Sequence, residues 1–143
     1  MEKLYNRVSI YYKKNEIIYL MPIGECIAFC GADTIIEPIE ILNLPTNQEL
    51  LLTEIEKCFD NCWKKVVTEI PKGLNIFEKL AKVKSRKQAV STFDYLSLTL
   101  DKTTHNYSLA YNWKKQKSYY ENPDNYEMND KIDFNFILSL IQG

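Results

Sequence analysis

Near the start of the chain, apolar and polar positions alternate. Val8, Ile10 and Tyr12 fall on every second position, which predicts a β-strand with one buried face. A polar turn at residues 13–16 separates this strand from a second apolar run over residues 17–21. Two short strands joined by a polar turn are typical of a β-hairpin, so a hairpin is predicted here.

The segment after this hairpin is also predicted to be extended. Pro22 and Gly24 interrupt the apolar run, and a third short strand is predicted over residues 26–30. Residues 34–42 form a further extended segment that contains Pro38. Because proline has no N–H to donate to a neighbouring strand, this segment is not expected in the middle of a sheet.

A helical pattern follows. Thr46 and Glu49 have the spacing of a capping box, in which the two side chains satisfy free N–H groups at a helix N-terminus. Apolar residues then recur at intervals of three or four, which predicts an amphipathic helix over residues 47–66. The residues of this stripe are Leu51, Ile55, Cys58, Cys62 and Val66.

Residues 75–92 predict one or two short helices, the first capped by Asn75 and the second by a capping box at residues 85–88. Their outward side chains form a basic set, which consists of Lys79, Lys82, Lys84, Arg86 and Lys87. A basic patch can bind phosphate, but no aromatic residues interleave with this one. We therefore interpret it first as a solvated helical surface.

A second hairpin is the clearest β unit in the sequence. Residues 95–100 and residues 107–113 both alternate with period two, and a polar turn joins them. Residues 114–129 show no periodicity and are predicted to be mostly loop. A C-terminal helix is predicted from Asp130 to residue 141. These elements predict an α+β fold, a single domain with a mainly antiparallel sheet built from hairpins and three to four helices packed on it.

Composition and length agree with one domain spanning residues 1–143. The chain is 45% apolar and 26% charged, so it can form a core and stay in solution. No apolar run approaches the roughly 18 residues that span a bilayer. The first residues lack the apolar core of a signal peptide. We therefore expect a cytoplasmic protein without a membrane partner.

The four cysteines form two C-x3-C pairs, a spacing that raises the question of a zinc site. Cys26 and Cys30 lie in a predicted strand, where positions four apart are roughly 13 Å from each other. That distance is too long for two ligands of one metal ion. Cys58 and Cys62 share the apolar face of the predicted helix and are interpreted as core residues. No metal site and no cofactor are predicted.

Charge is segregated along the chain, although the net charge is −1. Residues 1–14 have four bases and one acid, and residues 57–91 have nine bases and three acids. Between them, residues 15–56 have eight acids and no base. This acidic stretch is either a solvated surface of uneven charge or a face that attracts a basic partner.

Sequence signatures of catalysis are missing. The single histidine, His105, lies in a predicted turn, and the four glycines form no phosphate-binding loop. We therefore expect no catalytic residue and a protein that is not an enzyme. Ten tyrosines are present. They either cover the outer face of the sheet or provide large contact area for binding a partner.

The second half of the chain carries a family resemblance. Residues 74–87, which read LNIFEKLAKVKSRK, lead into the predicted strand at residues 95–100. A hairpin, a polar segment and an amphipathic helix ending in Ile137-Leu138-Ser139-Leu140-Ile141 then follow. Over residues 74–141 this order resembles the immunity proteins of bacterial contact-dependent growth inhibition systems.

The resemblance implies a cytoplasmic protein that binds one toxin domain tightly, in a one-to-one complex, and covers or distorts its active site. Many such toxins are nucleases, which are basic because they hold a phosphate backbone. An acidic face on the immunity protein would then mimic nucleic acid and steer association. Neither direct nucleic-acid binding nor a small-molecule substrate is expected. The candidate toxin-binding residues are Glu25, Asp33, Glu37, Glu40, Asp124, Tyr126 and Glu127.

Two other functions stay open at this point. The basic helices over residues 79–87 would suit a small nucleic-acid-associated binding protein. A hydrolase with dispersed carboxylates would leave no local signature, but it would need a cleft that holds two or more acids with raised pKa values.

Overall fold

The computed structural model describes residues 3–69 and 74–143. Within these ranges the chain forms one α+β domain with an antiparallel sheet and four α-helices, which confirms the predicted fold class. The strands are β1 (Tyr5–Lys13), β2 (Ile17–Cys26), β3 (Ala32–Ile35), β4 (Glu40–Asn43), β5 (Val66–Val67), β6 (Asp94–Asp101), β7 (Asn106–Lys115) and β8 (Tyr120–Asn129). The helices are α1 (Gln48–Asn61), α2 (Ile76–Leu80), α3 (Arg86–Thr92) and α4 (Phe134–Gln142).

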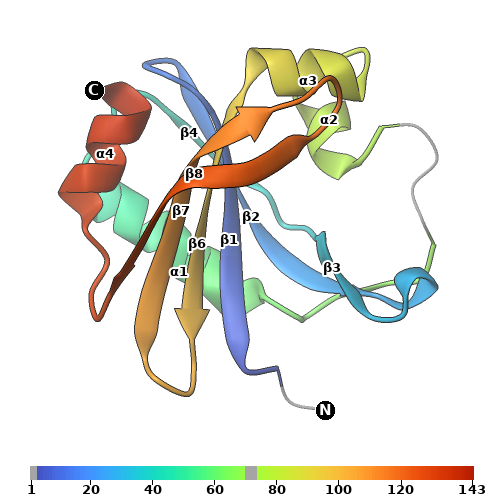
Figure 1. Ribbon diagram of the computed structural model, residues 1–143, viewed down its shortest axis with the longest axis horizontal. Helices are drawn as coiled ribbons and strands as arrows, with labels where there is room; N and C mark the ends of the chain where they lie inside the picture. Colours follow the sequence, from blue (N-terminus) through green and yellow to red (C-terminus); the bar gives the residue numbers. More distant parts are fainter. Residues whose placement is uncertain (1–2, 70–73) are drawn as a thin grey trace.

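The main path of the sheet runs β3-β2-β1-β6-β7-β8, and neighbours on this path are antiparallel. β1 joins the two predicted hairpins, because Ile10 pairs with Leu20 of β2 on one side and with Leu96 of β6 on the other. The first half of β2 also pairs with β4, and its last residues pair with β3 and with the short parallel strand β5. Figure 1 shows the strong twist of this sheet.

One face of the sheet, the helix-covered face, packs against α1 and α4. Val8 and Ile10 of β1 point to this side together with Leu96 of β6, and all three are fully buried. Leu51 of α1 and Ile141 of α4 meet them, as expected from the helical stripes in the sequence. Figure 1 shows α1 crossing behind the strands and α4 at the left of the sheet. Removing these side chains from water is the main source of stability for such a layered fold.

The opposite face, which we call the groove face, is covered only at one end. There Phe77 of α2 and Ala89 of α3 pack with Tyr19 and Met21 of β2 in a second apolar cluster. In Figure 1, α2 and α3 lie at the upper right, and no other helix formed by the described residues lies over this face. The sequence predicted the helices but not that they would leave part of the sheet uncovered.

The predicted third strand at residues 26–30 is wrong. β2 continues without a break through Pro22 and Gly24 to Cys26, and the chain then forms a 3-10 turn at Ile27–Phe29. The backbone N–H of Gly31 closes this turn on the carbonyl of Cys26. Gly24 does not interrupt β2: its missing side chain lets the strand approach the Lys65 carbonyl, which a Cβ would meet at 2.5 Å.

Helix α1 is shorter than predicted. It ends at Asn61 because Cys62 leaves the helical conformation, with φ −57° and ψ 137°, and Trp63 then donates its backbone N–H to the carbonyl of Ile23 in β2. Pairing with the end of β2 converts residues 66–67 into strand β5 instead of a last helical turn. The capping residue is also corrected: Asn47, not Thr46, accepts the hydrogen bond from the N–H of Leu50.

The loop predicted at residues 114–129 is largely strand β8, ten residues long. Its side chains are exposed or half-buried on both faces, so no apolar period marks it in the sequence. An edge strand needs no such period, because its backbone hydrogen bonds to β7 hold it in place. Helix α4 begins at Phe134, capped by Asp133, four residues later than the predicted start at Asp130.

The cysteines divide differently from the predicted pairs. Cys26, Cys58 and Cys62 are buried, which confirms Cys58 and Cys62 as core residues, whereas Cys30 is exposed at the end of the 3-10 turn. Cys26 and Cys30 are therefore joined by this turn and not separated by the predicted strand. Among the described residues no group of three or more potential metal ligands gathers. In the same part of the chain, no helix has the length and apolarity needed to cross a membrane.

Two adjacent leucines of α1 test the assignment of the helix-covered face. Leu51 is fully buried and Leu50 is 48% exposed. We expect Leu51→Ala to lower the free energy of unfolding by about 2–5 kcal/mol, because it leaves a cavity in the core. Leu50→Ala should lower it by less than about 1 kcal/mol. Urea denaturation followed by circular dichroism measures both, and equal effects would contradict the packing described above.

Candidate functional site

The uncovered part of the groove face is floored by small polar side chains. Arg7 of β1 pairs with Thr99 of β6, which pairs with Ser108 of β7. One step along the sheet, Ser9 pairs with Ser97, which pairs with Ala110. In the described part of the chain no helix lies over Ser9 and Ser97 (Figure 1), yet both are buried. Ser97, Ser108 and Ala110 line the floor of a hollow on this face.

This hollow has a volume of about 290 Å³. Larger side chains stand around its floor: Tyr95 of β6, Trp113 of β7 and Tyr126 of β8. Arg7 closes one end, where its Nε atom donates to the Thr99 hydroxyl at 3.0 Å. The hollow is thus polar at its base and aromatic at its rim.

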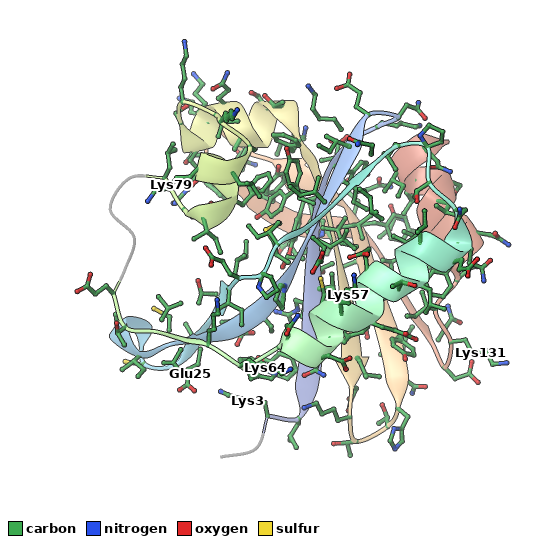
Figure 2. The ribbon with its side chains drawn as sticks, turned by 180° about the vertical axis from the view of Figure 1, so that it is seen from behind. Lys3, Glu25, Lys57, Lys64, Lys79 and Lys131 are labelled. Carbon is green, nitrogen blue, oxygen red and sulfur yellow. The ribbon has the colours of Figure 1, made fainter. Side chains whose placement is uncertain are left out.

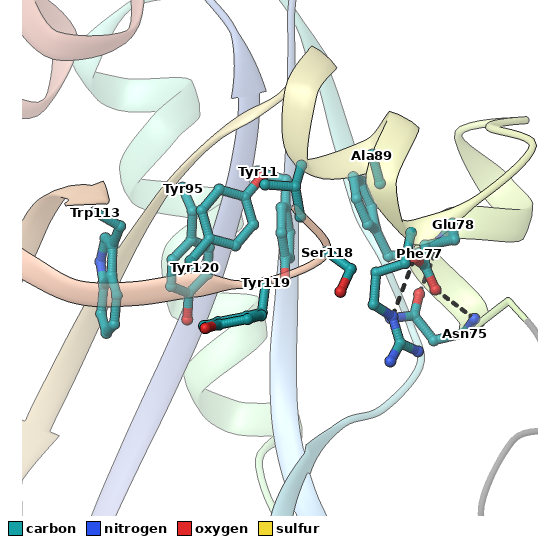
Figure 3. A pocket seen from close by; sticks show the side chains of 12 residues that line it. Tyr11, Asn75, Phe77, Glu78, Ala89, Tyr95, Trp113, Ser118, Tyr119 and Tyr120 are labelled. Carbon is teal, nitrogen blue, oxygen red and sulfur yellow. Dashed lines mark hydrogen bonds and ion pairs between the residues drawn. The ribbon is translucent and has the colours of Figure 1, made fainter. Parts of the chain in front are cut away.

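A second hollow, of about 320 Å³, adjoins the first between the β7–β8 hairpin and the helices α2 and α3. Tyr95 and Trp113 line both hollows. Tyr11, Phe77 and Tyr120 also line the second one, as Figure 3 shows. We call the two hollows together the aromatic groove.

The rings of the aromatic groove pack on one another in a row. Ring centroids are 5.1 Å apart between Trp113 and Tyr95, and 4.9 Å apart between Tyr95 and Tyr11. Tyr11 then stacks on Phe77 at 4.1 Å. Such pairs contribute about 0.5–1.5 kcal/mol each beyond the area they bury. The row therefore presents a rigid surface that loses little conformational entropy when it is covered.

The tyrosine hydroxyls of this row stay protonated at neutral pH. Burial, with the neighbouring tyrosines, raises the pKa of Tyr11 above its usual range. Burial, with the charge of Asp94, does the same for the pKa of Tyr120. The Tyr120 hydroxyl donates to the backbone carbonyl of Phe93 at 2.7 Å and so ties β8 to the end of α3. These groups act as neutral hydrogen-bonding and packing surfaces.

Among the described residues that line the groove there is one carboxylate, Glu78. It is buried and has a structural task, because its Oε1 atom accepts from the backbone N–H of Asn75 at 2.8 Å and completes the capping box of α2. Its Oε2 atom accepts from Nε of Arg86 at 3.4 Å, and Figure 3 marks both contacts. The pair of acids in a cleft that a hydrolase would require is therefore missing among these residues.

Glu25 and Asp33, the first two candidate residues from the acidic stretch, face each other in β2 and β3. Each has a basic partner from the N-terminal part of the chain. Lys3 Nζ lies 3.9 Å from Glu25, and Figure 2 shows the two side by side. Arg7 lies 3.3 Å from Asp33, which also accepts a 2.6 Å hydrogen bond from the Tyr5 hydroxyl.

Glu37 and Glu40 lie apart from that pair. Glu37 is 3.6 Å from Lys65, in a separate hollow beside α2. Glu40 sits in β4 against Glu54 of α1, whose Oε1 atom lies 3.1 Å from Lys57. The four acids expected to form a binding face are thus spread over three places, and three of them pair with bases of this chain.

The remaining candidates, Asp124, Tyr126 and Glu127, lie in β8 and not in a loop. Asp124 is 3.7 Å from Lys114, and both side chains are exposed. Tyr126 is 61% exposed at the rim of the aromatic groove. Glu127 accepts a 3.2 Å hydrogen bond from the Tyr111 hydroxyl on the helix-covered face. Of all candidates, Tyr126 alone lines the groove.

Sequence reasoning missed the groove residues Tyr95, Ser97 and Trp113 as a site. Their alternation identified the strands, but it assigned Trp113 to the face of Leu109 and Tyr111, whereas the structure places it on the groove face after the positive φ of Asn112. It did not show that this face stays uncovered, since that depends on where α2 and α3 dock. In the sequence no aromatic residues interleave with the basic patch. In the structure, however, Arg86 of that patch lines the aromatic groove.

Comparison with known proteins identifies a similar fold but indicates no activity. No family model matches the chain, and no curated protein matches it in sequence. A solved structure of a protein of unknown function from Neisseria meningitidis is similar, with a TM-score of 0.61 and 10% sequence identity. The match covers 97% of this chain and 93% of that one, so the two share an architecture over their whole length.

The Glu40–Glu54 pair predicts a pH dependence of stability. Burial, and then the adjacent carboxyl group of Glu54, raise the pKa of Glu40. The folded protein thus holds this proton more tightly than the unfolded chain. The stability that this bound proton adds is present in full below the ordinary glutamate pKa of about 4.3. It is lost as pH rises through the raised pKa of Glu40.

Replacing Glu40 with glutamine removes this titration and supplies an amide donor toward Glu54, whose Oε2 atom is buried without a partner among the described residues. Between about pH 4 and about pH 7 we expect the free energy of unfolding of Glu40→Gln to fall less than that of the unmodified protein. Urea denaturation at each pH measures the difference. Glu16→Gln, at an exposed position beside Lys13, serves as the control. Parallel profiles for Glu40→Gln and the unmodified protein would contradict the assignment.

Proposed function

We propose that this chain is an immunity protein of the contact-dependent growth inhibition type. In this proposal it acts in the cytoplasm and binds the C-terminal toxin domain of a secreted effector, which has nuclease activity. It is a binding protein and catalyses no reaction. The aromatic groove is the observation that carries the proposal.

The groove has the composition of a protein-binding surface. Tyrosine and tryptophan dominate the residues that contribute most to protein interfaces, because they bury large area with few rotatable bonds. Tyr95, Trp113 and Tyr126 surround a floor of serine and alanine side chains that leaves room for side chains of a partner. A contiguous uncovered surface of this kind is typical of an interaction site.

The order of elements adds support. Helices α2 and α3, the β6–β7 hairpin and helix α4 follow one another as in the segment on which the resemblance to immunity proteins rests. The polar segment between the hairpin and α4 is strand β8 in this chain. Tyr126 of β8, one of the expected contact residues, also supports the proposal, because it is exposed at the rim of the groove.

The first test is binding to the toxin domain of the secreted protein encoded beside this chain. We expect a one-to-one complex that co-purifies and abolishes the nuclease activity of the domain. Because the acids of this chain would steer a basic partner, the association rate should fall by at least about tenfold between low and physiological salt. No complex at any salt concentration would refute the proposal, and a rate independent of salt would remove its electrostatic part.

Truncation of Tyr126 tests whether the groove is the surface involved. We expect Tyr126→Ala to weaken binding by about 30-fold, which corresponds to about 2 kcal/mol for an aromatic residue in the centre of an interface. Ile27→Ala is the matched control, since Ile27 is 60% exposed and lies outside the groove. Calorimetric titration measures both, and equal affinities for the two variants would place the interface elsewhere.

Nucleic-acid binding remains the second candidate function because the five basic residues of α2, α3 and their connection are all exposed. If they bound a phosphate backbone, a mobility shift would appear and its log affinity would fall linearly with log salt. Lys82→Glu together with Lys87→Glu should then abolish the shift. We expect no shift for the unmodified protein, because the proposed partner is the toxin domain itself.

A further inference from the structure

The two ends of the sheet differ in how open they are to another strand. β3 ends the path on one side and is four residues long, whereas β8 ends it on the other and is ten residues long. Strands usually have about five or six residues, so β8 is a long edge. Within residues 3–69 and 74–143, no strand pairs with the side of β8 that faces away from β7.

A long edge of this kind exposes backbone N–H and C=O groups, and proteins usually shorten or cover it. In an antiparallel pair, alternate residues direct their hydrogen-bonding groups to one neighbour, so half of those in β8 point away from β7. Pro123 has no N–H, which limits a full ladder to residues 124–129. This length equals that of an ordinary strand.

Charge distinguishes β8 from the other acidic parts of the molecule. The strand has three acids, Glu121, Asp124 and Glu127, and no base. Glu121 and Glu127 accept hydrogen bonds from the neutral groups of Gln116 and Tyr111 and so keep their charge uncompensated. Only Asp124 has a basic neighbour, at 3.7 Å in an exposed pair. The acids of β2 and β3, by contrast, are paired with Lys3 and Arg7.

Apolar surface lies along the same edge on the groove face. Tyr126 is 61% exposed and Met128 is 60% exposed. Their cross-strand partners in β7 are Ala110 and Ser108, whose side chains are too small to cover them. An added strand would place every second side chain beside Tyr126 and Met128 on the groove face.

We infer that β8 accepts an extended basic segment of the partner protein as an additional strand of the sheet. Main-chain hydrogen bonds along residues 124–129 hold the segment, as in other cases of strand addition. Its apolar side chains alternate onto Tyr126 and Met128, and its lysine or arginine side chains lie near Asp124 and Glu127. This inference rests on the proposed function and specifies how the partner is bound.

Hydrogen exchange tests the inference on the complex of this chain with the toxin domain. We expect backbone amides within residues 124–129 that point away from β7 to exchange at least about tenfold more slowly in the complex, because they gain hydrogen-bond partners. The amides of β3, at the other end of the sheet, should be unchanged. A complex that forms without added protection in β8 overturns strand addition but leaves the proposed function standing. If no complex forms, both are overturned.

Charge reversal supplies a second readout. The triple variant Glu121→Lys, Asp124→Lys and Glu127→Lys should slow association by at least about tenfold at low salt. The control Glu16→Lys, Glu56→Lys and Asp60→Lys makes the same change in net charge at exposed positions outside β8, and it should slow association by less than about threefold. Circular dichroism confirms that both variants fold. Equal slowing by both variants overturns the role of the edge acids.

Discussion

The two-sided pairing of β1 is the constraint on which the rest of the structure depends. This strand lies between β2 and β6 and so joins two hairpins that are far apart in the sequence. Its period of two then assigns every neighbour to a face. Val8 and Ile10 build the core under α1 and α4, whereas Arg7 lines the aromatic groove and Ser9 lies on the same face against the Tyr95 hydroxyl. A shift of one residue would exchange the two sets and would bury an arginine in the core.

The groove follows from unequal coverage of the two faces. Helices α1 and α4 close one face, but α2 and α3 reach only one end of the other. Small side chains such as Ser97 and Ala110 would leave a void under a helix, and here they leave an open hollow instead. The large rings of Tyr95 and Trp113 pack against one another. The result is a surface that is rigid without a partner and can still be covered by one.

Acidic and basic residues are separated along the chain, but many of them lie close together in the folded structure. The acidic stretch at residues 15–56 and the basic segments beside it look like separate faces in the sequence. Antiparallel pairing brings them together, because β1 pairs with β2 and β2 pairs with β3, so Glu25 meets Lys3 and Asp33 meets Arg7. Such exposed pairs add at most about 1 kcal/mol each to stability, but they remove charge that a partner could use. Glu121 and Glu127 of β8 keep theirs, because their hydrogen-bond partners are the neutral side chains of Gln116 and Tyr111.

The sequence by itself determined the α+β class, both hairpins and the buried stripe of α1, because burial of a regular element imposes a period that can be counted. It also identified Tyr126 and Asp124 as candidates. It could not reveal strand β8, since an edge strand exposed on both faces carries no period. Nor could it show that Glu40 lies against Glu54, or that Tyr95 and Trp113 share a groove. Those facts depend on which elements dock on which face, and only the tertiary structure decides that, because pairing across the sheet brings residues together regardless of their distance along the chain.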